Sequence, residues 1–376
     1  MAIFNNKYNA IVSKTSAMQS LRKKFPVLNQ CIYANTAATG LLSEDLMEWR
    51  QGHDLDYLIG GSDMKAKSFE HMPKVKETVA RFFDCKPNNV ALVPNFSLGL
   101  NMLLEGLDKD QNVLLLSNDY PSLNWPFETR NFPRDYVGIN EYLEENILTK
   151  IKTGKFNVLA LSLVQWINGI QVDLEFLKQL KKDNPELLII ADGTQFCGIQ
   201  DFSFKDSGID VLLASSYKWL LAGYGNGFVL VKDGARDRFN LKTMGNGSVD
   251  RDESKRDNVH FCKYLEPGHL DSLNFGSLQF SLEFLDNIGM QHIQAQLKKL
   301  SNTAITVFGE LDLLDKSVLK REVHSTIFNI KGDGQLFKKL GKEDVVCALR
   351  GDGIRLSFHF YNTVEEIEAI AKLLTT

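Results

Sequence analysis

Short, uninterrupted apolar runs alternate with longer amphipathic segments through the middle of the chain. Runs rich in Val, Leu and Ile, without apolar–polar alternation, occur at Val90–Val93, Asn112–Leu116, Val158–Leu163, Leu187–Ala191, Val211–Ala214 and Phe228–Val231. Strands that are buried on both faces of a mainly parallel sheet have this pattern. Between them, Leu98–Gly106 and Leu174–Lys182 carry apolar residues at helical spacing. The alternation of strands and helices predicts an α/β domain with right-handed crossovers.

The pattern changes near Gly245. Residues 244–258 are polar and contain glycine, which predicts an exposed loop, and Leu278–Leu300 has the pattern of one long helix. The closing segments comprise three predicted strands and an amphipathic helix: Glu322–Ile330, Val345–Leu349, Ile354–Phe358 and Val364–Leu374. We therefore predict a large α/β domain over residues 20–290 and a small C-terminal α+β domain over 291–376, joined by the N-terminal segment 1–19.

The composition limits the partners and the compartment. The 376 residues are 44% hydrophobic and 24% charged with a formal net charge of −4, which favours neither nucleic acid nor an anionic membrane surface as a partner. Five widely spaced cysteines form no C-x-x-C motif, which argues against a disulfide framework or a zinc ribbon, and we expect no metal site. No signal-peptide pattern opens the chain, and no apolar run approaches a membrane-spanning length. We expect a cytoplasmic protein.

Candidate functional residues are densest between positions 187 and 231. Asp192 follows one predicted strand and Lys218 follows the next, 218 − 192 = 26 residues later, which is enough for one crossover. Ligands bind at the carboxyl ends of strands in open parallel sheets. Pyridoxal phosphate (PLP) needs a lysine amine, which carries it as a Schiff base, and a carboxylate that keeps its pyridine nitrogen protonated. The pair therefore predicts a PLP site, although Asp192 alone also fits a helix N-cap and Lys218 alone a surface lysine.

Several stretches carry a family resemblance. They are Tyr33–Gly40 (YANTAATG), Asn95–Asn101 (NFSLGLN), Val164–Gly169 (VQWING), Ala191–Gln195 (ADGTQ), Ser215–Trp219 (SSYKW) and Ile354–Thr363 (IRLSFHFYNT). In this order they resemble the signatures of the class V aminotransferases, a group of fold-type-I PLP enzymes that includes cysteine desulfurases, kynureninase and isopenicillin-N-epimerase-like proteins. The resemblance runs from about Tyr33 to the end of the chain and implies a mainly parallel seven-stranded sheet with a small C-terminal domain.

The resemblance also implies roles at the cofactor ring. Lys218 would hold the cofactor and act as general base, and Asp192 would bind the pyridine nitrogen. Tyr120 would stack on the ring as a third catalytic residue, although it also fits an ordinary half-buried tyrosine. Gln195 would bond the phenolic oxygen of the cofactor.

A second set of implied roles concerns the phosphate. The backbone amide of Phe96 and the side chain of Ser97 precede a helical pattern, where free N–H groups and the helix dipole favour an anion. Hydroxyl groups of Ser215 and Tyr217 would add donors. Ser277 matches a loop that in the family reaches the phosphate of the neighbouring subunit, which implies a homodimer.

The amino-acid substrate would be bound by Arg355, whose planar guanidinium suits a carboxylate, together with Asn35. A surface salt bridge is the alternative for Arg355. The family's usual Asn in the middle of the domain is replaced by Trp166. The desulfurase nucleophile is also missing: Cys347 lies 355 − 347 = 8 residues before Arg355 within an apolar predicted strand, and a buried thiol is inert.

These features predict a PLP enzyme that removes the α-proton of an amino acid, with transamination or epimerisation as the leading reaction. The alternatives are a C–S lyase of the cysteine desulfurase or selenocysteine lyase type, and a PLP-binding protein without turnover. A dinucleotide-binding enzyme is a weaker rival. The glycines from Gly223 to Gly227 are followed by a predicted strand, whereas the dinucleotide fingerprint requires a helix there.

Overall fold

The computed structural model describes residues 20–375. Its main sheet has seven strands in the order β2-β8-β7-β6-β5-β3-β4. Six strands run parallel, and only β8 runs antiparallel to its two neighbours. In sheet order the strands are β2 (Val90–Val93), β8 (Gly227–Val231), β7 (Val211–Ser215), β6 (Leu188–Asp192), β5 (Val158–Ser162), β3 (Val113–Leu116) and β4 (Arg134–Val137). The predicted α/β class and the mainly parallel seven-stranded sheet are confirmed.

Both faces of this sheet are buried, which explains the unbroken apolar runs. In β3, Val113 and Leu115 belong to one hydrophobic cluster, while Leu114 and Leu116 belong to the other. Successive side chains of a strand point to opposite faces, so each cluster covers one face. Helices α4 (Phe96–Leu104) and α5 (Pro121–Thr129) contribute to one cluster. Helices α3 (Asp63–Phe82), α6 (Leu143–Thr153), α7 (Leu174–Asp183) and α8 (Ser272–Ile288) contribute to the other.

A smaller antiparallel sheet occupies the C-terminal part of the chain. It has the order β11-β12-β9, and a separate parallel pair joins β1 to β10. These strands are β1 (Ile32–Tyr33), β9 (Ile327–Lys331), β10 (Val345–Val346), β11 (Ala348–Arg350) and β12 (Gly353–Ser357). The helices of this region are α9 (Met290–Glu310), α10 (Lys316–Leu319), α11 (Gly334–Lys342) and α12 (Val364–Thr375). The chain before the large sheet therefore also supplies one strand to the C-terminal part.

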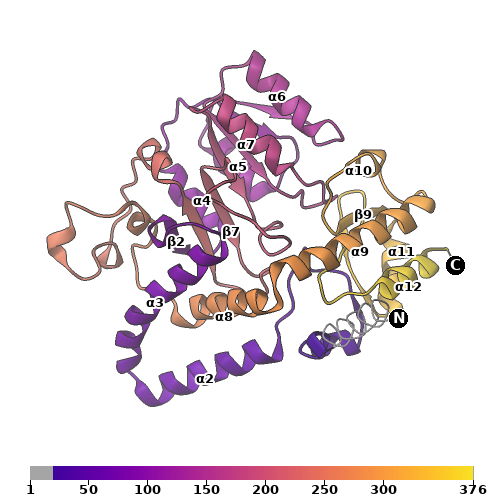
Figure 1. Cartoon of the computed structure of the whole chain (residues 1–376), viewed down its shortest axis with the longest axis horizontal. Coiled ribbons are helices and arrows are strands. Elements are labelled where there is room, and N and C mark those ends of the chain that lie inside the picture. Colours follow the sequence, from indigo (N-terminus) through magenta and orange to yellow (C-terminus); the bar gives the residue numbers. More distant parts are fainter. Residues whose placement is uncertain (1–19, 376) are drawn as a thin grey trace, which may run out of the picture.

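Three local expectations were wrong in detail. The strand predicted over Glu322–Ile330 begins only at Ile327, as β9. The long helix predicted over Leu278–Leu300 is two helices, because Gly289 has φ of +89° and ends α8 before α9 begins. Figure 1 shows α8 beneath the large sheet and α9 leading away from it toward β9. The strand predicted over Val345–Leu349 is interrupted at Cys347, so that β10 and β11 pair with different partners.

Some elements had no counterpart in the sequence prediction. The edge strand β4 has polar, partly exposed residues, and helix α2 (Glu44–Gly60) buries little besides Leu46. Figure 1 shows α2 outside the main body of the molecule. The polar segment 244–258 contains two of the six short 3-10 helices within residues 20–375, which are Pro26–Asn29, Pro87–Asn89, Asp233–Arg238, Asn246–Val249, Glu253–Lys255 and Phe261–Leu265.

Within the described residues, none of the helices combines the length and the apolar character that crossing a bilayer requires. The N-terminal segment 1–19, predicted to join the two domains, lies outside the described residues.

Candidate active site

The carboxyl ends of the central strands meet at one cavity of about 450 Å³. Asp192 ends β6, where it lies in register with Ser162 at the end of β5, and Ser215 ends β7. This is the position at which ligands bind in open parallel sheets. The cavity brings together eight of the residues predicted for the site, namely Phe96, Ser97, Tyr120, Asp192, Gln195, Ser215, Tyr217 and Lys218.

Lys218 reaches this cavity from the turn after β7 and is only 5% exposed. Its Nζ lies 5.6 Å from the ring centres of both Tyr120 and Tyr217. Burial lowers the pKa of Lys218 below the ordinary lysine range, the nearby Arg355 lowers it further, and Asp192 acts in the opposite direction. The structure therefore supplies an amine that gives up its proton more readily than a surface lysine.

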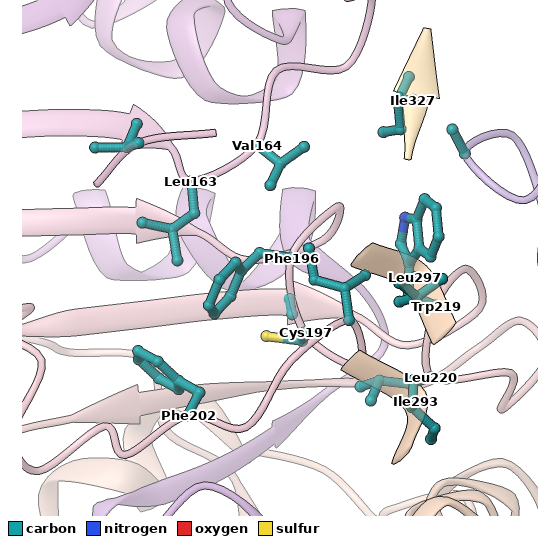
Figure 2. Close-up of a cluster of buried hydrophobic side chains, with 14 of the residues drawn as sticks. Leu163, Val164, Phe196, Cys197, Phe202, Trp219, Leu220, Ile293, Leu297 and Ile327 are labelled. Carbon is teal, nitrogen blue, oxygen red and sulfur yellow. The ribbon is translucent and has the colours of Figure 1, made fainter. Parts of the chain in front are cut away.

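The residues that follow Lys218 anchor it in the core. Trp219 and Leu220 are buried, and Figure 2 draws them in one cluster with Ile293 and Leu297 of α9. The indole Nε1 of Trp219 donates a 2.7 Å hydrogen bond to Oε1 of Gln195. The surface-lysine alternative is therefore wrong, because the backbone on the C-terminal side of Lys218 is fixed by apolar packing.

Asp192 faces the same cavity and is 5% exposed. Its Oδ1 accepts a 2.8 Å hydrogen bond from the backbone N–H of Thr194. Burial raises the pKa of Asp192, while the hydrogen bonds from Thr194 and the charge of Lys218 lower it and the charge of Asp119 raises it. Asp192 caps no α-helix, because the residues after it form turns. A buried carboxylate of this kind is suited to a cationic partner.

An anion-binding geometry lies at the start of α4. Asn95 caps this helix by accepting a 2.9 Å hydrogen bond from Leu98 N–H. The backbone N–H of Phe96 donates to Oγ of Ser215 at 2.8 Å. The Phe96 amide, predicted to bind phosphate directly, is thus already paired with Ser215, whose hydroxyl proton remains available to an anion. The helix N-terminus and this hydroxyl face the same cavity.

Gln195 is fixed at both ends of its side-chain amide. Its Nε2 donates to the carbonyl oxygen of Ala37 at 2.9 Å, and its Oε1 accepts from Trp219. One N–H of the amide group is left for the cavity. Its role toward a cofactor oxygen remains a prediction.

Arg355 on β12 is buried beside the site rather than on the surface. Its Nη1 donates a 2.6 Å hydrogen bond to the carbonyl oxygen of Trp166, and burial lowers its pKa to about 10. In the part of the chain that the structure describes, Arg355 Nε and Asn35 Oδ1 are buried polar atoms without a hydrogen-bond partner. Buried polar groups are normally satisfied, so these two atoms are compatible with a polar ligand. Neither Arg355 nor Asn35 is among the residues that line the cavity, and their role toward a substrate stays a prediction.

Ser277 is a correction to the prediction. It lies within helix α8, which begins after the capping residue Asp271, rather than in a loop. Its hydroxyl is buried, donates to the carbonyl oxygen of Leu273 at 2.7 Å and accepts from Arg50 Nη1 at 3.0 Å. Its predicted contact with the phosphate of a neighbouring subunit stays a prediction.

Among the residues in or beside the cavity that the sequence interpretation missed, three make notable contacts. Thr194 lines it and accepts a 3.2 Å hydrogen bond from Ser215 N–H. Tyr224 stacks on Tyr217 with ring centres 4.5 Å apart. Asp119 is buried beside Tyr120 and close enough to Asp192 to raise its pKa. Asp119 follows the carboxyl end of β3, so the rule that identified Asp192 also applies to it.

Cys347 lies between β10 and β11 and is buried. Burial raises its pKa to about 11, so the thiol stays protonated at neutral pH. It is not among the residues that line the cavity.

The model of the aminotransferase class-V family matches residues 33–370. The chain belongs to this family. Enzymes of this family depend on PLP, and the resemblance identified in the sequence is confirmed.

Individual relatives of this class V chain carry different names. It is 21% identical to a probable cysteine desulfurase of Borreliella burgdorferi, over 96% of both chains. It is 23% identical to the uncharacterized aminotransferase YcbU of Bacillus subtilis, over 93% of this chain and 95% of that relative. The solved complex of the cystine C–S lyase C-DES with its product cysteine persulfide has a TM-score of 0.82 and 17% identity, covering 93% of this chain and 98% of that one. At such identity the structural similarity supports the fold.

Proposed function

We propose that this class V chain holds PLP on Lys218 and acts on an α-amino acid by removing and returning its α-proton. The observation that carries the proposal is the Lys218 amine, which lies buried between the rings of Tyr120 and Tyr217 with its pKa lowered by burial. A positioned amine with a pKa closer to neutrality is a suitable general base.

The residues at the cavity fit the cofactor. Asp192 provides a buried carboxylate for the pyridine nitrogen, and the N-terminus of α4 with Ser97, Ser215 and Tyr217 provides donors for the phosphate. Tyr120 lies on the lysine side of the cavity, where its ring is available for stacking. When bound, PLP supplies an electron-withdrawing ring that acidifies the α-carbon of the substrate.

Other residues of the chain would bind the substrate and transfer the proton. Arg355 binds the substrate carboxylate through its fixed guanidinium, and the carbonyl of Trp166 keeps that group in place. Asn35 adds a buried side-chain oxygen, able to accept a hydrogen bond from a bound amine. Lys218 accepts the α-proton and delivers it again. Epimerisation requires a proton to return to the opposite face of the α-carbon, whereas transamination requires its delivery to a carbon other than the α-carbon.

Transamination or epimerisation remains our leading reaction, because the desulfurase route needs a thiolate. Burial raises the pKa of Cys347 to about 11, so its thiol stays protonated at neutral pH. In addition, Cys347 does not line the cavity. A C–S lyase is the second candidate. It is supported by the fold shared with the cystine C–S lyase C-DES, since elimination of a sulfur leaving group also begins with loss of the α-proton.

A panel of amino acids separates these reactions when α-keto product, inversion of the α-carbon and sulfur release are measured in parallel on the PLP-loaded protein. Lys218→Ala is the matched control, and borohydride fixation should place the cofactor on the peptide that contains Lys218. Fixation on another lysine would overturn the proposal.

We also infer a homodimer in the cytoplasm. Helix α2 ends in an exposed apolar patch, in which Leu58 is 80% and Ile59 77% exposed, and contiguous exposed apolar surface commonly marks an interaction site. Two-fold dimers are the commonest assembly. All five cysteines are free, which suits a reducing compartment. Sedimentation of the wild type and of Leu58→Glu tests the dimer, since the charged variant should be monomeric.

A further inference from the structure

Asp119 is a second buried carboxylate at the candidate active site. It lies between β3 and α5, directly before Tyr120, and is 4% exposed. Its Oδ1 accepts a 2.7 Å hydrogen bond from the backbone N–H of Tyr120, and its Oδ2 accepts a 2.8 Å bond from that of Ser162. The Asp119 carboxylate therefore links the backbone of Tyr120 to the end of β5.

This connection leads directly to Asp192. Ser162 and Asp192 are partners in the parallel pairing of β5 with β6. Asp119 thus fixes two things at once, namely the backbone of the predicted stacking residue and the strand end beside the predicted partner of the pyridine nitrogen. Both Tyr120 and Asp192 line the cavity.

Helix capping does not account for Asp119. Helix α5 begins at Pro121, which has no N–H, and its N-cap residue is Tyr120 without a side-chain capping bond. The carboxylate of Asp119 instead accepts from Tyr120 itself and from a residue of a different strand. The contact is therefore specific to the junction of β3 and β5.

Burial and hydrogen bonding act in opposite directions on the charge of Asp119. Burial has the largest effect and raises the pKa of Asp119, whereas hydrogen bonds from Ser162, Tyr120 and Gln165 lower it. Both carboxylate oxygens accept a backbone N–H. The charged group that faces it from β6 is Asp192, which is in turn influenced by Lys218. Hydrogen bonds to an ionised carboxylate favour the charged form.

We propose that Asp119 is a positioning residue for the reaction: as an ionised carboxylate it holds Tyr120 at the cofactor site and favours protonation of the lysine–cofactor unit beside Asp192. The inference rests on the proposed function. The negative charge of Asp119 would then affect the protonation of the lysine–cofactor unit, which hydrogen bonding alone would not do.

Asp119→Asn tests it, because the amide keeps the size and one acceptor oxygen but removes the charge. The readout is the pH midpoint of the visible absorbance band of bound PLP, with no substrate present. Loss of a nearby negative charge disfavours the protonated form, so the midpoint should fall by about half a pH unit or more. Asp119→Glu keeps the charge and should restore the wild-type midpoint.

The matched control is Asp210→Asn. Asp210 is also buried and accepts a 2.9 Å hydrogen bond from a strand N–H, that of Ile189, but it precedes β7 at the opposite end of the sheet. Unlike Asp119, within the described residues it also forms a 2.8 Å ion pair with Lys181, so Asp210→Asn controls for loss of a buried carboxylate away from the cavity. Its removal should leave the midpoint unchanged.

A folded Asp119→Asn variant that binds PLP with the wild-type midpoint would overturn the inference. Asp119→Ser is the second uncharged variant in case the amide is not tolerated. If neither uncharged variant folds while Asp119→Glu does, the carboxylate is only structural and the inference is wrong. Failure of the proposed function is distinguishable, because the wild type itself would then show no visible band.

Discussion

Gly40 and Lys218 are in backbone contact: a Cβ atom at residue 40 would lie 1.9 Å from the carbonyl oxygen of Lys218. The Gly40 N–H also donates a 2.8 Å hydrogen bond to the carbonyl oxygen of Tyr217. The N-terminal segment before α2 is thereby held against the turn that presents the lysine. Residue 40 must be glycine for this approach, because no side chain fits between the two backbones.

Gly40→Ala should therefore displace the Lys218 turn. Overpacking a filled site costs about 1–3 kcal/mol of folding free energy. We expect a lower melting temperature and slower, weaker PLP incorporation, measured by thermal unfolding of the apoprotein and by absorbance. Gly52→Ala is the control, since a Cβ there meets no atom within 4 Å. Equal behaviour of the two variants would contradict the close approach.

Cofactor attachment should depend on pH through Lys218. The neutral amine is the nucleophile, and burial lowers the pKa of Lys218, so the rate of PLP incorporation should rise with pH and level off well below the ordinary lysine pKa of about 10.4. Asp192 raises the pKa of Lys218, so Asp192→Asn should move this midpoint to still lower pH. Stopped-flow absorbance of apoprotein mixed with PLP measures the pH midpoint of incorporation for the wild type and for Asp192→Asn. A wild-type midpoint near 10 would refute the expectation.

Asp192→Ala should impair turnover more than cofactor retention. Leaving a buried charge without its partner costs roughly 3–5 kcal/mol, which corresponds to a loss of about two to four orders of magnitude in rate. Donors at the start of α4 and at Ser215 should retain part of the cofactor. Asp192→Asn preserves an acceptor for the Thr194 N–H and isolates the charge. Near-wild-type turnover of Asp192→Asn would show that the charge of Asp192 is not needed for catalysis.

Cys347→Ser should leave activity within about twofold of the wild type. The buried site will bear a modest penalty for the hydroxyl, of about 1–3 kcal/mol. The thiol itself should react slowly with iodoacetamide between pH 6 and 9, since its pKa is raised to about 11 by burial. Selective loss of sulfur release from cysteine, with an unchanged melting temperature, would instead support the desulfurase alternative.

The sequence by itself determined the strands and the residues that follow them. The central strands are buried on both faces, so their unbroken apolar runs are local signals, and the carboxyl-end rule then placed Asp192 and Lys218 in one crevice. The edge strand β4 carries no such signal, because its residues face solvent as well as the sheet. Asp271 is a favourable N-capping residue, and helix α8, which contains Ser277, begins directly after it.

Only the tertiary structure decided which polar groups satisfy one another. Phe96 N–H pairs with Ser215, Arg355 with the Trp166 carbonyl, and Asp119 with Ser162, across separations of 43 to 189 residues. Hydropathy patterns report burial and periodicity along the chain, whereas these bonds depend on the distance and angle between segments that are distant in sequence. The central strands and the pair Asp192 and Lys218 were therefore accessible from local patterning, and the other residues of the cavity were predicted from the family resemblance. The geometry of the site arises from the packing of the strands against one another.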